Sequence, residues 1–221
     1  MVSRMRQQPL NNDLDRDPGT GHATAAISRR QALWLLGLLC GAVVLLALGG
    51  ETARQALRYE RSAVIAGEYW RLITGHLVHS SVAHLVLNMA GLALVPGLFP
   101  RDYSLRQWLL IAAFSVASID VGFVFYEPQL QWYVGLSGAL HGALAAGAVA
   151  WWRHETSLLA LLLSLLLGGK LLWEQVHGAL PFSGDMPVIV DAHLYGALGG
   201  LLAGLLIWLG LQDWPARRRS L

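Results

Sequence analysis

One serine and one histidine of this chain are of residue types that can take part in catalysis, and both lie in apolar surroundings. Ser137 follows Gly135-Leu136 and precedes Gly138, and His193 lies early in an apolar run near the C-terminus. A serine whose proton is taken by a histidine can attack a peptide carbonyl. Ser137 is therefore a candidate nucleophile and His193 a candidate general base. The competing interpretations are that Ser137 is a packing residue among glycines and that His193 is a satisfied core residue.

His84 and Asn88 form a second polar pair inside an apolar run. Their i, i+4 spacing places them on one face of a helix. Polar side chains are costly inside a membrane and are often functional there. Hydrogen bonding between packed helices would explain the pair equally well.

No carboxylate is placed by spacing alone as a third member of a Ser-His group. Asp191 is two residues from His193, so the two side chains point in different directions on one helix. Asp120, and Glu174 with Gln175, fall near the outer ends of apolar runs, where solvation explains them. We therefore expect Ser137 and His193 to act as a pair, and replacing Asp191 by Asn to preserve far more activity than replacing Ser137 by Ala.

The elements that must position these residues are apolar helices. Of 221 residues, 55% are hydrophobic and 14% are charged, whereas about a quarter of an average soluble domain is charged. Six apolar runs each approach the ~20 residues that cross hydrocarbon. The runs are 32–48, 82–99, 105–125, 134–152, 157–173 and 188–211. The sequence predicts an all-α integral membrane protein with six transmembrane helices.

The domain organisation follows from the polar segments. Residues 1–30 have no hydrophobic period and are expected to form a disordered cytoplasmic tail. The six-helix domain is expected at 31–212, followed by a basic cytoplasmic tail at 213–221. Residues 49–79 are amphipathic and should lie on the membrane surface. Eleven of the 16 Lys and Arg residues fall on the side of both termini, which the positive-inside rule places in the cytoplasm.

In this topology the polar groups share one depth. The second, fourth and sixth helices run inward from the outer side, so His84, Ser137 and His193 lie about one or two turns below the outer surface. Water can reach that depth only through a cavity. Small residues would let the fourth and sixth helices approach closely. These are Gly138, Gly142, Ala145, Ala146, Gly196, Gly200 and Gly204.

The ordered set of motifs resembles the rhomboid family of intramembrane serine proteases. The matches, between about residues 67 and 205, are Trp70-Arg71, His79, His84-x-x-x-Asn88, Gly135-Leu136-Ser137-Gly138 and Ala192-His193-x-x-Gly196-x-x-x-Gly200. The resemblance implies a rhomboid-like fold and a catalytic dyad of Ser137 and His193. It also implies that His84, Asn88 and a backbone N–H near Ser137 stabilise the oxyanion. Trp70 and Arg71 are expected to anchor the 49–79 segment.

His141 departs from the commoner rhomboid pattern, in which a tyrosine packs on the catalytic histidine. With the Gly-Leu-Ser-Gly-Ala-Leu-His-Gly stretch, it resembles the bacterial rhombosortase branch. That branch is associated with substrates bearing a C-terminal Gly-Gly motif, a membrane helix and a basic tail, and it implies the bacterial inner membrane. His141 could stack on His193, act as the base or simply pack; we favour stacking. Gly135 and Gly138 are expected to support the same site.

The expected partners are membrane-anchored protein substrates and the lipid bilayer. A net charge of +2 gives no reason to expect nucleic acid, and no cofactor or metal is expected. A metalloprotease is disfavoured because there is no His-Glu-x-x-His stretch, and a transporter because no inverted repeat can be identified. A non-catalytic rhomboid-like pseudoprotease that binds membrane helices is the main rival, but the presence of both Ser137 and His193 favours catalysis.

Overall fold

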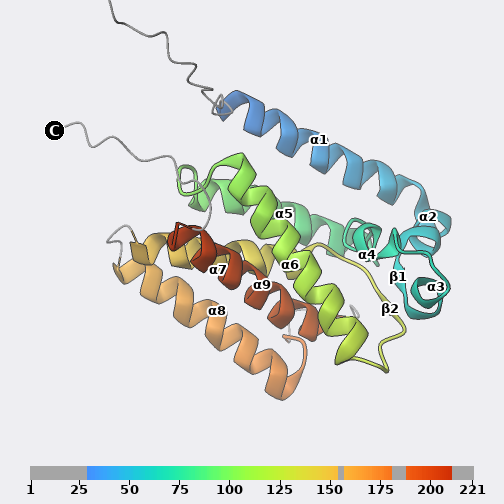
Figure 1. Cartoon of the computed structure of the whole chain (residues 1–221). Helices are drawn as coiled ribbons and strands as arrows, with labels where there is room; N and C mark the ends of the chain where they lie inside the picture. The colour runs from blue at the N-terminus through green and yellow to red at the C-terminus, as the bar shows by residue number, and fades with distance from the viewer. Residues whose placement is uncertain (1–28, 154–156, 181–187, 211–221) are drawn as a thin grey trace, which may run out of the picture.

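The computed structural model describes residues 29–153, 157–180 and 188–210, and within these ranges the chain is a bundle of apolar helices (Figure 1). The long helices are α1 (Arg29–Leu48), α5 (Val82–Leu98), α6 (Leu105–Phe125), α7 (Ser137–Arg153), α8 (Ser157–His177) and α9 (Val190–Trp208). Between α1 and α5 lie α2 (Gly50–Leu57), β1 (Tyr59–Glu60), α3 (Arg61–Ile65) and α4 (Arg71–Thr74). The predicted helical class is confirmed, apart from one small sheet. The two predicted tails lie almost wholly outside the described residues.

The sheet joins the 49–79 segment to the chain that leads into α7. Strand β1 pairs antiparallel with β2 (Trp132–Tyr133), so that Tyr59 lies opposite Tyr133. Sequence periodicity did not predict these strands, because two residues are too few to establish an alternation.

The number of membrane spans differs from the six expected. Among the described residues, three helices are long and apolar enough to cross a bilayer: α6, α9 and residues 158–177 of α8. Helix α1 continues into α2 across a bend of 112°, and this pair could form a fourth span. Helices α5 and α7 have 17 residues each, which at 1.5 Å per residue gives about 25 Å, shorter than the ~30 Å hydrocarbon core. Six spans therefore remain a proposal.

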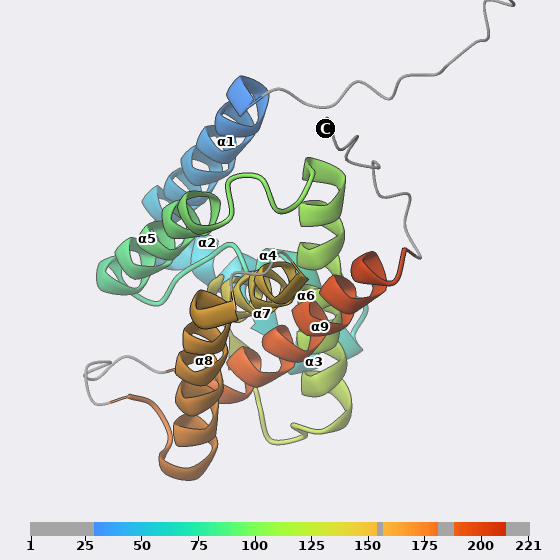
Figure 2. The ribbon, with the colours of Figure 1, turned by 90° about the vertical axis from the view of Figure 1, so that its left-hand side faces the viewer.

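Helix α7 occupies the centre of the bundle. It contacts α5, α6, α8 and α9, and its most extensive contact is with α9. Viewed from the side in Figure 2, these four helices surround α7, while α1 lies at the periphery next to α5. The first residues of α7 are therefore enclosed by neighbouring helices.

Glycines bring α7 and α9 into backbone contact, as predicted. A Cβ atom added to Gly196 would collide with the carbonyl group of Gly138, and one added to Gly200 would collide with the carbonyl group of Gly142. Helices approach this closely in membranes only where side chains are absent or very small. The close approach is what brings the first turns of α7 and α9 together.

We expect Gly200→Ala to lower the free energy of unfolding by about 1–3 kcal/mol, because the added methyl group overpacks this contact. Denaturant titration in mixed micelles measures the change. Gly168→Ala is the matched control, since a Cβ at Gly168 meets no atom within 4 Å and alanine favours a helix over glycine. Equal stability changes in the two variants would contradict the packing argument.

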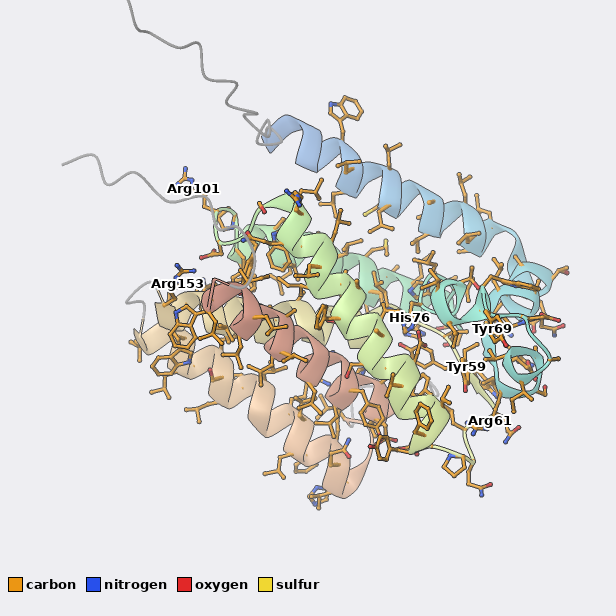
Figure 3. The ribbon with its side chains drawn as sticks, in the orientation of Figure 1. Tyr59, Arg61, Tyr69, His76, Arg101 and Arg153 are labelled. Carbon is orange, nitrogen blue, oxygen red and sulfur yellow. The ribbon has the colours of Figure 1, made fainter. Side chains whose placement is uncertain are left out.

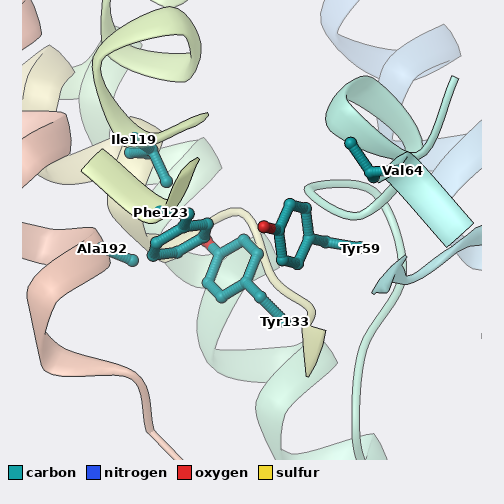
Figure 4. Close-up of a cluster of buried hydrophobic side chains, with 6 residues drawn as sticks. All are labelled: Tyr59, Val64, Ile119, Phe123, Tyr133 and Ala192. Carbon is teal, nitrogen blue, oxygen red and sulfur yellow. The ribbon is translucent and has the colours of Figure 1, made fainter. Parts of the chain in front are cut away.

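A cluster of buried side chains joins the 49–79 segment to the bundle (Figure 4). It consists of Tyr59, Val64, Ile119, Phe123, Tyr133 and Ala192, with Leu72, Leu130, Ile189 and Tyr195 packed against it. The rings of Tyr59 and Phe123 are 5.5 Å apart, and those of Phe123 and Tyr133 are 4.8 Å apart. The cluster fixes β2 against α6, just before the chain reaches Ser137.

Two arginines hold the 49–79 segment in place. Arg61 donates hydrogen bonds to the carbonyls of Phe123 and Val124 at the end of α6, where helix carbonyls lack internal partners. Arg71 donates to the carbonyls of Gln55 and Arg58, which is the anchoring role predicted for it. Trp70 is 53% exposed, and its anchoring role stays a prediction.

Candidate active site

Ser137 is the first residue of α7 because the chain before it cannot be helical. The predicted start of this helix at residue 134 is wrong. Gly135 has a φ of 121°, a conformation that favours glycine. Its N–H donates to the carbonyl of Gly75, and its carbonyl accepts from the Tyr133 hydroxyl at 2.5 Å. The segment is thus held from both sides, and the serine stands where helix N–H groups are unpaired and the dipole is positive.

His193 lies in the first turn of α9 and faces Ser137. Its Nε2 atom is 2.9 Å from Ser137 Oγ, within normal hydrogen-bond range. His193 as a whole residue is 5% exposed. The structure therefore brings together the two residues that sequence reasoning paired.

Glu174 of α8 completes this arrangement and was not predicted. Its Oε2 atom is 2.9 Å from His193 Nδ1, and the residue is 3% exposed, so solvation is the wrong explanation for it. The run was expected to end at residue 173, whereas the helix continues to His177. A sequence signal did exist, because Lys170 and Glu174 are spaced i, i+4 in an otherwise apolar helix.

Lys170 lies beside both members of this contact. Its Nζ atom is 2.7 Å from Glu174 Oε1 and 3.3 Å from His193 Nδ1. The two carboxylate oxygens of Glu174 are therefore shared, one facing the lysine and one facing the histidine. Each carboxylate oxygen of Glu174 therefore has its own partner.

His141 stacks on His193. The two ring centroids are 4.1 Å apart and the ring planes differ by 17°. His141 Nδ1 is 2.7 Å from the carbonyl oxygen of Ser137, so this nitrogen carries the proton and donates it. Stacking is the arrangement favoured from the sequence, and the Ser137 hydroxyl contacts His193 instead.

His84 and Asn88 lie beside the glycine that precedes the serine. A Cβ atom added to Gly135 would be 2.7 Å from His84 Nε2 and 3.6 Å from Asn88 Nδ2. Asn88 is 3% exposed, and its Nδ2 has no hydrogen-bond partner among the described residues. His84 Nδ1 is 3.0 Å from the Ser80 hydroxyl. With that hydroxyl as donor, Nε2 carries the proton, so both side chains offer N–H groups beside Gly135, two residues before Ser137.

His79 supports His84 from the loop before α5. The two rings meet edge to face with centroids 5.1 Å apart. Burial, and then the neighbouring His84, lower the pKa of His79 to about 4. His79 is therefore neutral at pH 7, and it places no second positive charge beside the site.

Asp120 contacts His76 of the 49–79 segment rather than the Ser137–His193 pair. Its Oδ1 atom is 3.5 Å from His76 Nε2, and the His76 ring meets Tyr133 edge to face at 5.3 Å. Asp120 is largely buried, so solvation does not explain it. Through Tyr133, whose hydroxyl donates to the Gly135 carbonyl, this contact reaches the segment that precedes Ser137.

His141, Glu174 and His193 could be considered as a metal site, since their donor atoms lie within 4.8 Å of one another. Zinc is bound by such residue types. However, the Lys170 ammonium lies against both Glu174 and His193, so a cation there would face a like charge. The donor set therefore fits a hydrogen-bonded network better than a metal centre.

We expect His141→Tyr to retain measurable cleavage, because a phenol ring can also stack on His193. Initial rates of substrate cleavage, compared with wild type and His141→Ala, measure the effect. His141→Ala should be the more damaged of the two. Complete loss in the tyrosine variant, with its folding intact, would instead point to a proton-transfer role for His141.

Comparisons with known proteins show which family the chain belongs to. A rhomboid domain model matches residues 66–210. YdcA of Bacillus subtilis (strain 168), which carries a provisional rhomboid protease name, is 30% identical over 149 residues, 65% of this chain and 69% of YdcA. The rhomboid protease GluP of the same strain is 35% identical over 103 residues, 44% of this chain and 20% of GluP. RHOMBOID-like protein 7 of Arabidopsis thaliana is 28% identical over 160 residues, 70% of this chain and 48% of that protein.

The matches to GluP and to the Arabidopsis protein thus span less than half of those proteins, and that to YdcA about two thirds. The rhomboid domain model covers well over half of this chain and includes Ser137 and His193. The chain is an integral membrane protein that belongs to the rhomboid family.

Proposed function

We propose that this protein is an intramembrane serine endopeptidase that uses Ser137 and His193 as a catalytic dyad. The observation that carries the proposal is the 2.9 Å separation of Ser137 Oγ and His193 Nε2. It is supported by the protease names of the relatives. A non-catalytic binding role would not require a nucleophile and a base to meet at a helix N-terminus.

In the proposed mechanism Ser137 Oγ attacks the scissile carbonyl and its proton passes to His193 Nε2. The oxyanion that forms accepts hydrogen bonds from Asn88 Nδ2–H, His84 Nε2–H and a backbone N–H at the start of α7. His193 then gives the proton to the leaving amine. In the second half, His193 removes a proton from water as that water attacks the acyl ester, and His193 then returns the proton to Ser137 Oγ as the acid product leaves.

The proposed topology has six spans and both termini in the cytoplasm. In Figure 3, Arg101 and Arg153 lie at one end of the bundle, while Arg61 and His76 lie at the opposite end. The active-site residues are in the first turns of α7 and α9 and near the end of α8, toward the end that holds the 49–79 segment. Because 11 of the 16 Lys and Arg residues fall on the side of Arg101, Arg153 and both termini, that side is proposed to be cytoplasmic. Cleavage would then occur near the extracytoplasmic face, in this proposal that of the bacterial inner membrane.

The proposed substrates are membrane-anchored proteins with a C-terminal Gly-Gly motif, a membrane helix and a basic tail. This rests on the resemblance of the stretch from Gly135 to Gly142 to the rhombosortase branch. The stacked His141 in place of a tyrosine is the structural feature consistent with that branch. Glycines near a helix end also expose the backbone to attack.

The test is cleavage of a co-expressed reporter that carries such a tail, by wild type and by Ser137→Ala and His193→Ala. Cleavage by wild type alone supports the protease and its substrate class. Cleavage of a generic membrane-anchored rhomboid substrate, but not of this reporter, overturns the substrate class and keeps the mechanism. Binding of the reporter without cleavage of either substrate favours the pseudoprotease alternative.

A further inference from the structure

We propose that Glu174 is a positioning residue that turns the Ser137–His193 dyad into a three-membered system, with Lys170 setting the position and the effective charge of the carboxylate. This inference rests on the proposed function, because it concerns the same serine and histidine. It assigns a role to two charged residues that the dyad mechanism does not use.

The first argument concerns the tautomer of His193. A neutral imidazole carries one N–H, and it can accept the Ser137 proton at Nε2 only if that N–H is at Nδ1. Nδ1 then needs an acceptor, and Glu174 Oε2 is 2.9 Å away. In serine proteases with a third member, a buried carboxylate plays this part. Glu174 reaches the histidine from a different helix than Asp191 does, which explains why sequence spacing missed it.

The second argument concerns charge. Proton transfer from Ser137 creates an imidazolium in a site where His193 is 5% exposed. A carboxylate against Nδ1 stabilises that charge. The Lys170 ammonium, 3.3 Å from Nδ1, opposes it. The two residues therefore act on His193 with opposite sign, which gives them distinguishable effects.

The third argument concerns geometry. Lys170 Nζ holds Glu174 Oε1 at 2.7 Å, so rotation of the carboxylate away from His193 would break two contacts. On the other face of His193 the stacked His141 ring limits tilting. The imidazole is thus fixed at Nδ1, at Nε2 and across its ring plane.

Other titratable groups around His193 lie on the helices packed against it or on α9 itself. His141 faces it from α7, and His84 interacts with it electrostatically from α5. From α6, Asp120 is directed to His76. On α9 itself, Tyr195 donates to Glu127. Within the described residues, Glu174 is the carboxylate that contacts the His193 ring.

The experiment uses the full chain, purified in detergent, and a fluorophosphonate probe that phosphonylates an activated serine. The rate of labelling of Ser137 is measured from pH 5 to pH 9 for wild type, Glu174→Gln, Glu174→Asp and Lys170→Met. Asp191→Asn is the matched control, because it removes a carboxylate on the same helix turn as His193 without a hydrogen bond to it. Thermal stability is recorded for each variant.

We expect Glu174→Gln to slow labelling by roughly 100- to 10,000-fold, since the amide no longer enforces the tautomer. The acidic midpoint of its pH–rate profile should move about one unit lower, whereas that of Lys170→Met should move higher. Glu174→Asp should recover part of the rate, and Asp191→Asn should match wild type. A merely structural role would alter stability but would not move the two midpoints in opposite directions.

Wild-type rate and midpoint in folded Glu174→Gln would overturn the inference while leaving the proposed function intact. If Glu174→Gln does not fold, an unchanged midpoint in Lys170→Met overturns it. Failure of wild type to label at any pH, with His193→Ala behaving identically, would overturn the proposed function itself.

Discussion

Ser137→Ala, His193→Ala and the double variant are each expected to lose the same activity, about a million-fold in kcat. Each single change removes a member of a group that acts as a unit, so the losses do not add. The short contact between Ser137 Oγ and His193 Nε2 is the structural reason, because neither atom can perform its step without the other. Cleavage rates of a purified reporter under single-turnover conditions measure the three losses.

Circular dichroism and thermal unfolding in detergent control for misfolding. Both substitutions shorten a side chain at a helix start, so the fold should survive. Losses that multiplied in the double variant would show that the two residues act independently. That result would overturn the dyad even if both single variants were inactive.

Asn88→Ala is expected to lower kcat by about 100- to 1,000-fold, with little change in KM, because an oxyanion donor acts mainly in the transition state. The buried Asn88 amide has an Nδ2–H beside Gly135 that meets no acceptor in the described parts of the chain, where an oxyanion at Ser137 would need it. Removing it leaves the developing charge with fewer donors. Steady-state kinetics on a membrane-anchored reporter solubilised in detergent separate kcat from KM.

Gln107 provides a matched control for Asn88. It is also a buried amide, and its Nε2 likewise has no partner among the described residues, but its Oε1 caps the start of α6 with Ser104. Gln107→Ala should therefore lower stability without lowering kcat in the folded protein. Equal kcat values for Asn88→Ala and wild type would remove Asn88 from the oxyanion site.

Much of the fold could be predicted because hydropathy and helix caps act locally. Helix α6 has the bounds expected from its apolar run, and its start is explained by a capping box of Ser104 and Gln107. The start of α7 could not be predicted in the same way. The residues from Val134 to Leu136 are apolar, and only the φ of Gly135 and its contacts with Gly75 and Tyr133 keep them out of the helix.

The candidate site likewise has a part that could be predicted from the sequence and a part that could not. The meeting of Ser137 and His193 followed from a shared depth and from the glycines of α7 and α9. Glu174 could not be placed, because its contact depends on how α8 rotates against α7 and α9, and residue spacing within one helix says nothing about rotation between helices. The sequence signal for this contact was the Lys170–Glu174 charge pair within an apolar run, because charged residues inside a membrane helix are often functional.

The Lys170–Glu174 pair also bears on how this protein is made. Its two charges lie one turn apart on α8 and touch each other, so the helix carries its own counter-charge. An isolated lysine costs about 2.5–3.5 kcal/mol on insertion at the centre of a helix. Mutual neutralisation lowers the cost of inserting the Lys170–Glu174 pair before any neighbour is present. Helix α8 can therefore enter the bilayer ahead of α9 during synthesis, and the acid that meets His193 is already in place when the last helix arrives.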